Sequence, residues 1–238
     1  MPEDLKADLV ISYHRVRTAL GLMGMCLPVA LLVGGLMDLG VIEPSISDFY
    51  HTTYRDIYVG TLTAIGVFLL AYRGHRKSGA EWIADDMLAT LAGAAAIALA
   101  LFPNESPSAE VVTVTQSVLG LGGAPLVHYA AGIVFCLCLA AMNFFKFART
   151  CRMGRRRIYL ACGWIILGCM VGLFLASFAK VTNAGGWGDW VSRWRVIFVL
   201  EALGIWAFGL SWLVKGRADL AMAMRVQSFR DYVMRLRP

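Results

Sequence analysis

Six long apolar runs divide the chain and limit the folds that are open to it. A helix needs roughly 18 or more apolar residues to cross the hydrocarbon core of a bilayer, which is about 30 Å thick. Hydrocarbon offers backbone N–H and C=O groups no partner outside the segment, so runs of this length are expected to be helices. The runs cover about residues 18–40, 57–73, 84–103, 127–147, 158–178 and 195–214. The sequence therefore predicts an all-α, polytopic membrane protein with six transmembrane helices.

The composition and the chain ends fit the same class. A mean hydropathy of +0.64 with only 16% charged residues argues against a soluble domain. The first run ends in Met37-Asp38 without a small-residue cleavage site, so we expect a retained span and not a signal peptide. Three parts follow: an amphipathic cytoplasmic lead over 1–17, a transmembrane domain over 18–215, and a basic amphipathic cytoplasmic tail over 216–238.

The basic residues predict the orientation of the spans. If the N-terminus is cytoplasmic, eighteen of the 22 Lys and Arg residues fall in cytoplasmic segments. The remaining four are Arg55, Lys180, Arg193 and Arg195. This asymmetry follows the positive-inside rule, so both termini are predicted to be cytoplasmic. The net charge of +6 then reflects orientation and contact with anionic lipid, and we expect no nucleic-acid partner.

Polar residues concentrate in one segment between the first two spans, on the predicted outer side. This segment, Glu43–Asp56, reads EPSISDFYHTTYRD and includes one of the four histidines. His128 opens the fourth span on the same side, and Glu201 lies about 9 Å along the sixth at about 1.5 Å per residue. A carboxylate at that depth costs several kcal/mol unless it is paired, so we expect Arg195, Arg55 or a proton to compensate it.

These residues allow three interpretations. The first is an outward-facing pocket for an anionic lipid headgroup. Arginine forks match phosphate oxygens, and the pocket would be shaped by carboxylates, a histidine and an aromatic ring. The candidate arginines are Arg55, Arg193 and Arg195, and the other candidates are Asp48, Tyr50, His51, Asp56 and Glu201.

The second interpretation is a metal-dependent hydrolase acting on a lipid amide or ester. His51, His128 and Asp48 would hold zinc with one position open for water, and Glu201 would be the general base, with His51 as a further catalytic candidate. No Gly-x-Ser-x-Gly elbow or Walker loop is present. Ser45 or Ser47 could be paired with His51 as nucleophile and base, but the sequence does not favour this pairing, because serines near a histidine are common in loops.

The third interpretation is structural. Ser47 and Asp48 would cap the approach to the second helix within a hydrogen-bonded polar belt. The protein would then be a subunit of a membrane assembly, with another membrane protein or a second copy as its partner. Asp85 and Asp86 are expected to favour the N-terminal dipole of the third span.

Small residues predict where helices approach closely. One face of the third span carries Gly93 among alanines, the first span has Gly21 and Gly24, and the second has Gly60-xxx-Ala64. Such residues let backbones pack where no hydrophobic effect drives association.

The order of these motifs resembles a known family. Pro44-Ser-Ile-Ser-Asp48 follows the first span, His128 opens the fourth with Ala131 and Phe135 after it, and Glu201 lies early in the last. This pattern resembles the Frag1/DRAM/Sfk1 superfamily of six-helix membrane proteins and the bacterial proteins similar to it. The segment His51–Arg55 and Ala202 after the glutamate depart from the family pattern.

The resemblance implies a role in lipid biology. Members of the superfamily are associated with the remodelling of GPI-anchor lipids, with the modulation of autophagy, and with lipid organisation in the plasma membrane. For this chain the resemblance implies a cell-membrane location, in a bacterium the inner membrane, with membrane lipids as partners.

Overall fold

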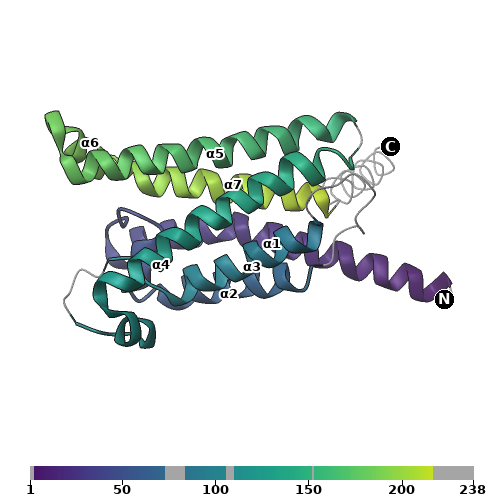
Figure 1. The fold of residues 1–238 in the computed structure, drawn as a ribbon, viewed down its shortest axis with the longest axis horizontal. Coiled ribbons are helices and arrows are strands. Elements are labelled where there is room, and N and C mark those ends of the chain that lie inside the picture. Colours follow the sequence, from purple (N-terminus) through teal and green to yellow (C-terminus); the bar gives the residue numbers. More distant parts are fainter. Residues whose placement is uncertain (1–2, 73–83, 106–109, 152, 217–238) are drawn as a thin grey trace, which may run out of the picture.

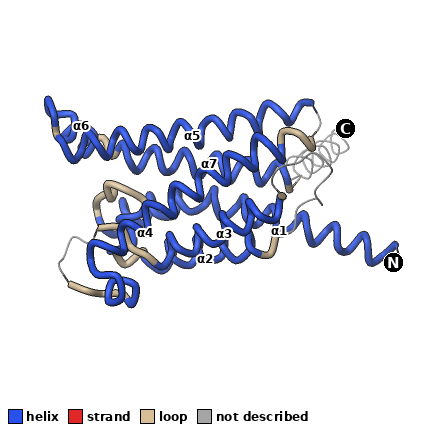
Figure 2. The backbone as a smooth tube through the Cα atoms, viewed as in Figure 1, coloured by secondary structure: helices blue, strands red, loops and turns tan. Residues whose placement is uncertain are grey.

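The computed structural model describes residues 3–72, 84–105, 110–151 and 153–216, and this part of the chain is helical with no β-strand (Figure 2). The predicted all-α class is therefore confirmed for the described residues. The helices are α1 (Glu3–Gly34), α2 (Arg55–Leu70), α3 (Asp85–Leu101), α4 (Val114–Ala141), α5 (Met153–Thr182), α6 (Trp187–Arg193) and α7 (Val196–Lys215). Short π-helical turns extend α1 and α4 over Gly35–Leu39 and Met142–Phe147, and 3₁₀ turns form at Ser47–His51 and Ala184–Gly186.

Four of these helices are long and apolar enough to cross a membrane, which indicates a membrane protein. The four stretches are His14–Leu39, Val114–Phe147, Gly154–Thr182 and Val196–Lys215. They overlap with the first, fourth, fifth and sixth predicted spans, although the stretch at the fourth position begins at Val114 and the predicted span at about residue 127. The helices at the second and third positions, α2 and α3, have 16 and 17 residues. At about 1.5 Å per residue they measure about 24–26 Å, short of the roughly 30 Å hydrocarbon core. Six spans and their orientation therefore stay predictions.

The predicted division into lead, transmembrane domain and tail stays a prediction. The backbone of α1 runs as one helix from Glu3 to Gly34, so no break marks the predicted boundary at residue 17. Figure 1 shows the beginning of α1 projecting beyond the other helices. The predicted tail lies outside the described residues, apart from Gly216.

The six long helices form a closed ring around the bundle axis. In order around the ring they are α1, α2, α3, α4, α5 and α7, and α7 packs back against α1 (Figure 1). Successive long helices run in opposite directions, so the two ends of the bundle collect different loops. The short α6 packs at one end against α5 and α7.

Glycines set the closest approaches between helices. A Cβ on Gly66 of α2 would lie 2.8 Å from the Gly93 oxygen of α3, and a Cβ on Gly93 would lie 2.7 Å from the Gly66 oxygen. Gly21 of α1 similarly meets Gly209 of α7. The packing role predicted for Gly93 and Gly21 is confirmed. The role predicted for Gly60 is wrong, because that residue lies on an exposed face with nothing near its Cβ position.

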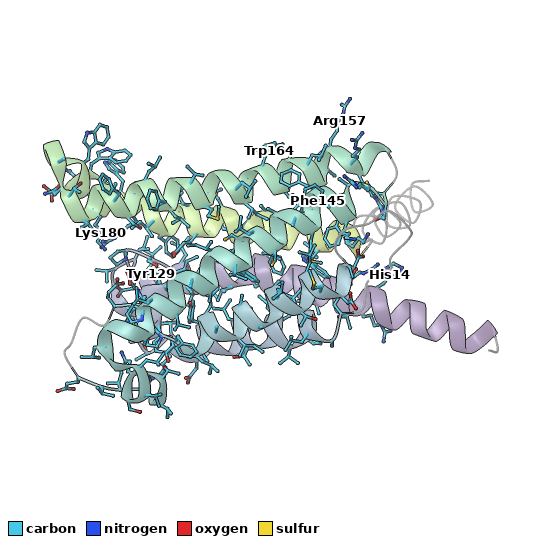
Figure 3. All side chains as sticks on the ribbon, in the orientation of Figure 1. His14, Tyr129, Phe145, Arg157, Trp164 and Lys180 are labelled. Atoms are coloured by element: carbon cyan, nitrogen blue, oxygen red, sulfur yellow. The ribbon has the colours of Figure 1, made fainter. Side chains whose placement is uncertain are left out.

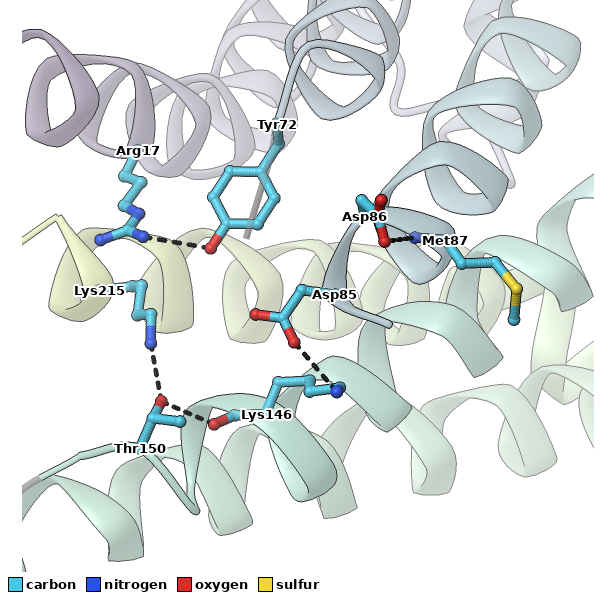
Figure 4. Close-up of polar contacts among 8 residues, drawn as sticks. All are labelled: Arg17, Tyr72, Asp85, Asp86, Met87, Lys146, Thr150 and Lys215. Carbon is cyan, nitrogen blue, oxygen red and sulfur yellow. Dashed lines mark hydrogen bonds and ion pairs between the residues drawn. The ribbon is translucent and has the colours of Figure 1, made fainter. Parts of the chain in front are cut away.

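Charged and aromatic side chains form hydrogen bonds and an ion pair at the end of the bundle that holds Arg17, Tyr72, Asp85 and Lys215 (Figure 4). Asp85 pairs with Lys146 at 3.1 Å, and both side chains are nearly buried. The Arg17 guanidinium donates to the Tyr72 hydroxyl at 3.2 Å, and Lys215 donates to Thr150 at 3.0 Å. Asp85 thus joins α3 to the end of α4 through an ion pair, a contact that the helix-dipole prediction did not include.

Candidate functional site

The opposite end of the bundle is closed by loop one, defined here as residues 40–54 between α1 and α2. Loop one folds back among the helices, and its apolar side chains Ile46 and Phe49 are buried. Phe49 packs near Phe198 in the first turn of α7. The Phe198 N–H donates to the Pro44 carbonyl at 3.0 Å, which satisfies one of the backbone donors left free at the start of α7. The polar residues of loop one therefore face helix ends and not only solvent.

Glu201, in the second turn of α7, is bound by loop one. Its Oε2 accepts the Ile46 N–H at 2.6 Å, and the Ser45 hydroxyl lies 3.0 and 2.9 Å from Oε1 and Oε2. Hydrogen bonds to an ionised acceptor are stronger than those between neutral groups. Neither Arg195 nor Arg55 forms an ion pair with this carboxylate in the described part of the chain, so those two of the three expected compensations are wrong. The third, a proton on Glu201, stays a prediction.

His128 links loop one to the end of α3. Its ring is buried in α4, with Nδ1 2.7 Å from the Phe102 carbonyl and Nε2 3.0 Å from the Ser47 hydroxyl. A carbonyl oxygen only accepts hydrogen bonds, so Nδ1 carries a proton. In the neutral ring Nε2 then accepts the Ser47 O–H.

Asn104 joins Asp48 to His51. The Asn104 amide donates to Asp48 Oδ1, and its carbonyl oxygen lies 3.1 Å from His51 Nε2. The amide oxygen is an acceptor, so His51 donates through Nε2. Asn104 is only 5% exposed, and it was not predicted as a site residue. The sequence feature that could have identified Asn104 as a site residue is its position directly after Pro103, at the end of an apolar run.

The predicted capping of the second helix is wrong. The residue before α2 is Tyr54, and no side chain caps the helix there. Ser47 bonds instead to His128, and Asp48 bonds to Asn104. Both residues connect loop one to α3 and α4.

The zinc candidates are already engaged in hydrogen bonds of this network. Both ring nitrogens of His128 are in hydrogen bonds, and His51 Nε2 is bonded to Asn104. Within the described ranges no three His, Cys, Asp or Glu side chains are grouped to hold a metal. The zinc site of His51, His128 and Asp48 stays a prediction that the donor geometry does not favour.

The three predicted headgroup arginines have different surroundings. The Arg55 guanidinium lies over the Tyr50 ring, 4.4 Å from its centroid, and donates to the Tyr50 hydroxyl at 2.9 Å. Arg195 donates to the Ser192 carbonyl at 3.3 Å from a left-handed backbone conformation (φ 50°), and Arg193 is exposed. Asp56 is exposed in the first turn of α2, where its charge favours the helix dipole.

Glu43 carries charge at the rim of loop one. Its partial burial, followed by the nearby charge of Asp48, raises the pKa of the Glu43 carboxyl above its ordinary value of 4.5. Arg195 and His51 are close enough to oppose that rise. The charges of Asp48, His51 and Arg195 therefore all act on the Glu43 carboxyl.

The fold and this cluster define a helical membrane protein with a hydrogen-bonded polar network at one end of its bundle. Comparisons of the chain with models of protein families, with curated proteins and with solved structures give no match. The resemblance to the Frag1/DRAM/Sfk1 superfamily therefore rests on the sequence motifs alone: Pro44–Asp48, His128 with Ala131 and Phe135, and Glu201.

Proposed function

We propose that the protein is a six-span protein of the cell membrane, with both termini cytoplasmic, that binds the anionic headgroup of a lipid at its outer end. In a bacterium this membrane is the inner one. Loop one, the start of α7 and the α6–α7 corner form the binding face. The proposal takes α2 and α3 as spans, with their flanking residues completing the crossing.

The observation that carries the proposal concerns the contacts of Arg55, Arg193 and Arg195, the three arginines predicted to lie on the outer side. Among the described residues no carboxylate lies within ion-pair distance of Arg55, Arg193 or Arg195. Arg55 is held by an aromatic ring and a hydroxyl, and Arg195 by a carbonyl. These partners hold Arg55 and Arg195 without an ion pair, and the carboxylate that acts on Arg195 is Glu43 at a longer range. Positive charge that is positioned but not neutralised suits the oxygens of a phosphate.

The hydrogen-bonded network supports the proposal as a scaffold. Ser45 with Glu201, Ser47 with His128, and Asp48 with Asn104 join loop one to α7, α4 and α3. The segments that carry the family resemblance are the ones that this network connects. The resemblance to the Frag1/DRAM/Sfk1 superfamily, whose members act in lipid biology, favours a lipid as the ligand.

A binding measurement on the purified protein tests this function. We expect a fluorescent phosphatidylglycerol to bind more tightly than the phosphatidylcholine analogue, and Arg55→Ala with Arg195→Ala to weaken binding about tenfold or more. A charge-assisted hydrogen bond contributes about 1.5–3 kcal/mol, and about 1.4 kcal/mol is a factor of ten.

Lys180→Ala is the matched control, because Lys180 is an exposed cation in the last turn of α5, at the same end of the bundle (Figure 3). Its binding should equal that of the wild type. Unchanged phosphatidylglycerol binding in the double arginine variant contradicts the headgroup site.

A further inference from the structure

Ser47, His128 and the Phe102 carbonyl form a line of hydrogen bonds with a fixed direction. The carbonyl fixes the proton on His128 Nδ1, so Nε2 presents its lone pair to the Ser47 hydroxyl 3.0 Å away. A serine bonded to a histidine that is itself oriented by an acceptor is the arrangement that activates a nucleophile. The three groups come from loop one, α4 and the end of α3, which are distant in sequence.

The two serines of the motif differ in accessibility and in partner. Ser45 is buried, at 8% exposure, and its oxygen already accepts the Ser47 N–H while its hydroxyl faces Glu201. Ser47 is partly exposed, whereas its partner His128 is 3% exposed. Ser47 is therefore the serine of the two whose hydroxyl meets a histidine nitrogen and whose residue is not fully buried.

We propose that Ser47 and His128 are a nucleophile and general base for acyl transfer from a carboxylic ester. The Ser47 oxygen attacks the ester carbonyl carbon while its proton moves to His128 Nε2. The bond from that carbon to the alcohol oxygen breaks, and His128 returns the proton to the leaving alcohol. Water then attacks the acyl group on Ser47, His128 takes the proton of the water, and the carboxylic acid leaves as the proton returns to Ser47.

Tyr58 is placed to assist this step. Its buried hydroxyl lies beside Ser47, and its bond to the Leu99 carbonyl is long at 3.5 Å. A tyrosine hydroxyl in a site shielded from water stabilises an oxygen that gains negative charge during acyl transfer. The identity of the ester as a lipid rests on the proposed headgroup site, whereas the reactivity of Ser47 does not depend on it.

Covalent labelling tests the pair without any assumption about the substrate. Purified protein is treated with a fluorophosphonate probe, which phosphonylates activated serines with loss of fluoride, and the modified residue is found by peptide mass spectrometry. We expect the label on Ser47 and a labelling rate about 100-fold or more lower in His128→Gln, since a general base contributes about 10²–10⁴ in rate. Ser117→Ala is the control, because Ser117 is exposed and its hydroxyl donates to the Val114 carbonyl, not to a histidine.

A second arm separates this inference from the headgroup proposal. The variant with Arg55→Ala and Arg195→Ala should keep the Ser47 label and lose release of fatty acid from phosphatidylglycerol vesicles. Label on Ser47 with unchanged fatty-acid release in that variant supports the pair and contradicts the headgroup site. Absence of label on Ser47 in folded wild-type protein overturns the pair, whatever the variants do.

Discussion

Removing the Glu201 carboxylate should destabilise the folded protein measurably. Two donors lose their acceptor in Glu201→Ala: the Ile46 N–H and the Ser45 hydroxyl. Each donor left buried without a partner costs about 1–3 kcal/mol. Hydrogen bonds between membrane helices average only about 0.6 kcal/mol, because the unfolded chain in the membrane also finds partners. We therefore expect a loss near the lower end of the sum, about 2 kcal/mol.

Glu201→Gln separates the role of the hydrogen bonds from that of the charge. Glutamine keeps one acceptor oxygen for the Ile46 N–H and turns a donor toward the Ser45 oxygen, so its loss should be about 1 kcal/mol or less. The assay is unfolding of the purified protein in mixed micelles titrated with dodecyl sulfate. Glu110→Ala, an exposed glutamate, should stay within about 0.5 kcal/mol of the wild type. Equal stability of the Glu201→Ala and Glu110→Ala proteins refutes this account of how loop one is held.

Three further predictions concern other parts of the bundle. Gly66→Ala should cost about 1–3 kcal/mol in the same assay, because its Cβ meets the Gly93 oxygen, while Gly60→Ala, which faces open space, should be neutral or mildly stabilising. Asp85→Asn should cost about 3–5 kcal/mol, because it removes the carboxylate charge that lies 3.1 Å from the buried Lys146 ammonium. Lys146→Met added to Asp85→Asn should restore part of that loss, and no recovery would count against the ion pair. The raised pKa of Glu43 means that the folded state favours the protonated carboxyl, so its contribution to stability is lost as pH rises through that pKa. Melting temperatures of Glu43→Gln should accordingly depend less on pH than those of the wild type across the acidic range.

The fold class could be predicted from sequence because it depends on run length and hydropathy alone. The positions of α2 and α3 also followed from the apolar runs, but their lengths did not, since end residues of a helix depend on the loops that follow. Gly93 was recognisable as a packing residue from its alanine neighbours. Gly66 was not singled out, because which face of α2 meets α3 depends on the ring order of the helices.

The candidate site could be located from sequence, but its pairings could not. Pro44–Asp48, His128 and Glu201 were prominent as polar residues next to apolar runs. Their partners depend on loop one folding back into the bundle, which brings Ser45 and the Ile46 N–H to Glu201. No periodicity in the sequence indicates that loop one returns into the bundle, so the expected partner of Glu201 was an arginine or a proton and not the donors of loop one. From the sequence, Asp85 was assigned to the dipole of the third span, and Lys146 was counted among the basic residues that predict the orientation of the spans. Nothing in their spacing reveals that they contact each other across helices.

The side of the membrane reached by loop one tests the central claim most directly. Single cysteines are introduced at Thr53, an exposed residue of loop one, and at Asp86, an exposed residue at the start of α3, with the unmodified protein as background. A six-span protein with cytoplasmic termini predicts that a membrane-impermeant maleimide labels Thr53→Cys in intact cells. Asp86→Cys should be labelled only after the cells are permeabilised. Labelling of both positions from outside would show that α2 does not cross, and the reverse pattern would place loop one and its arginines on the cytoplasmic side.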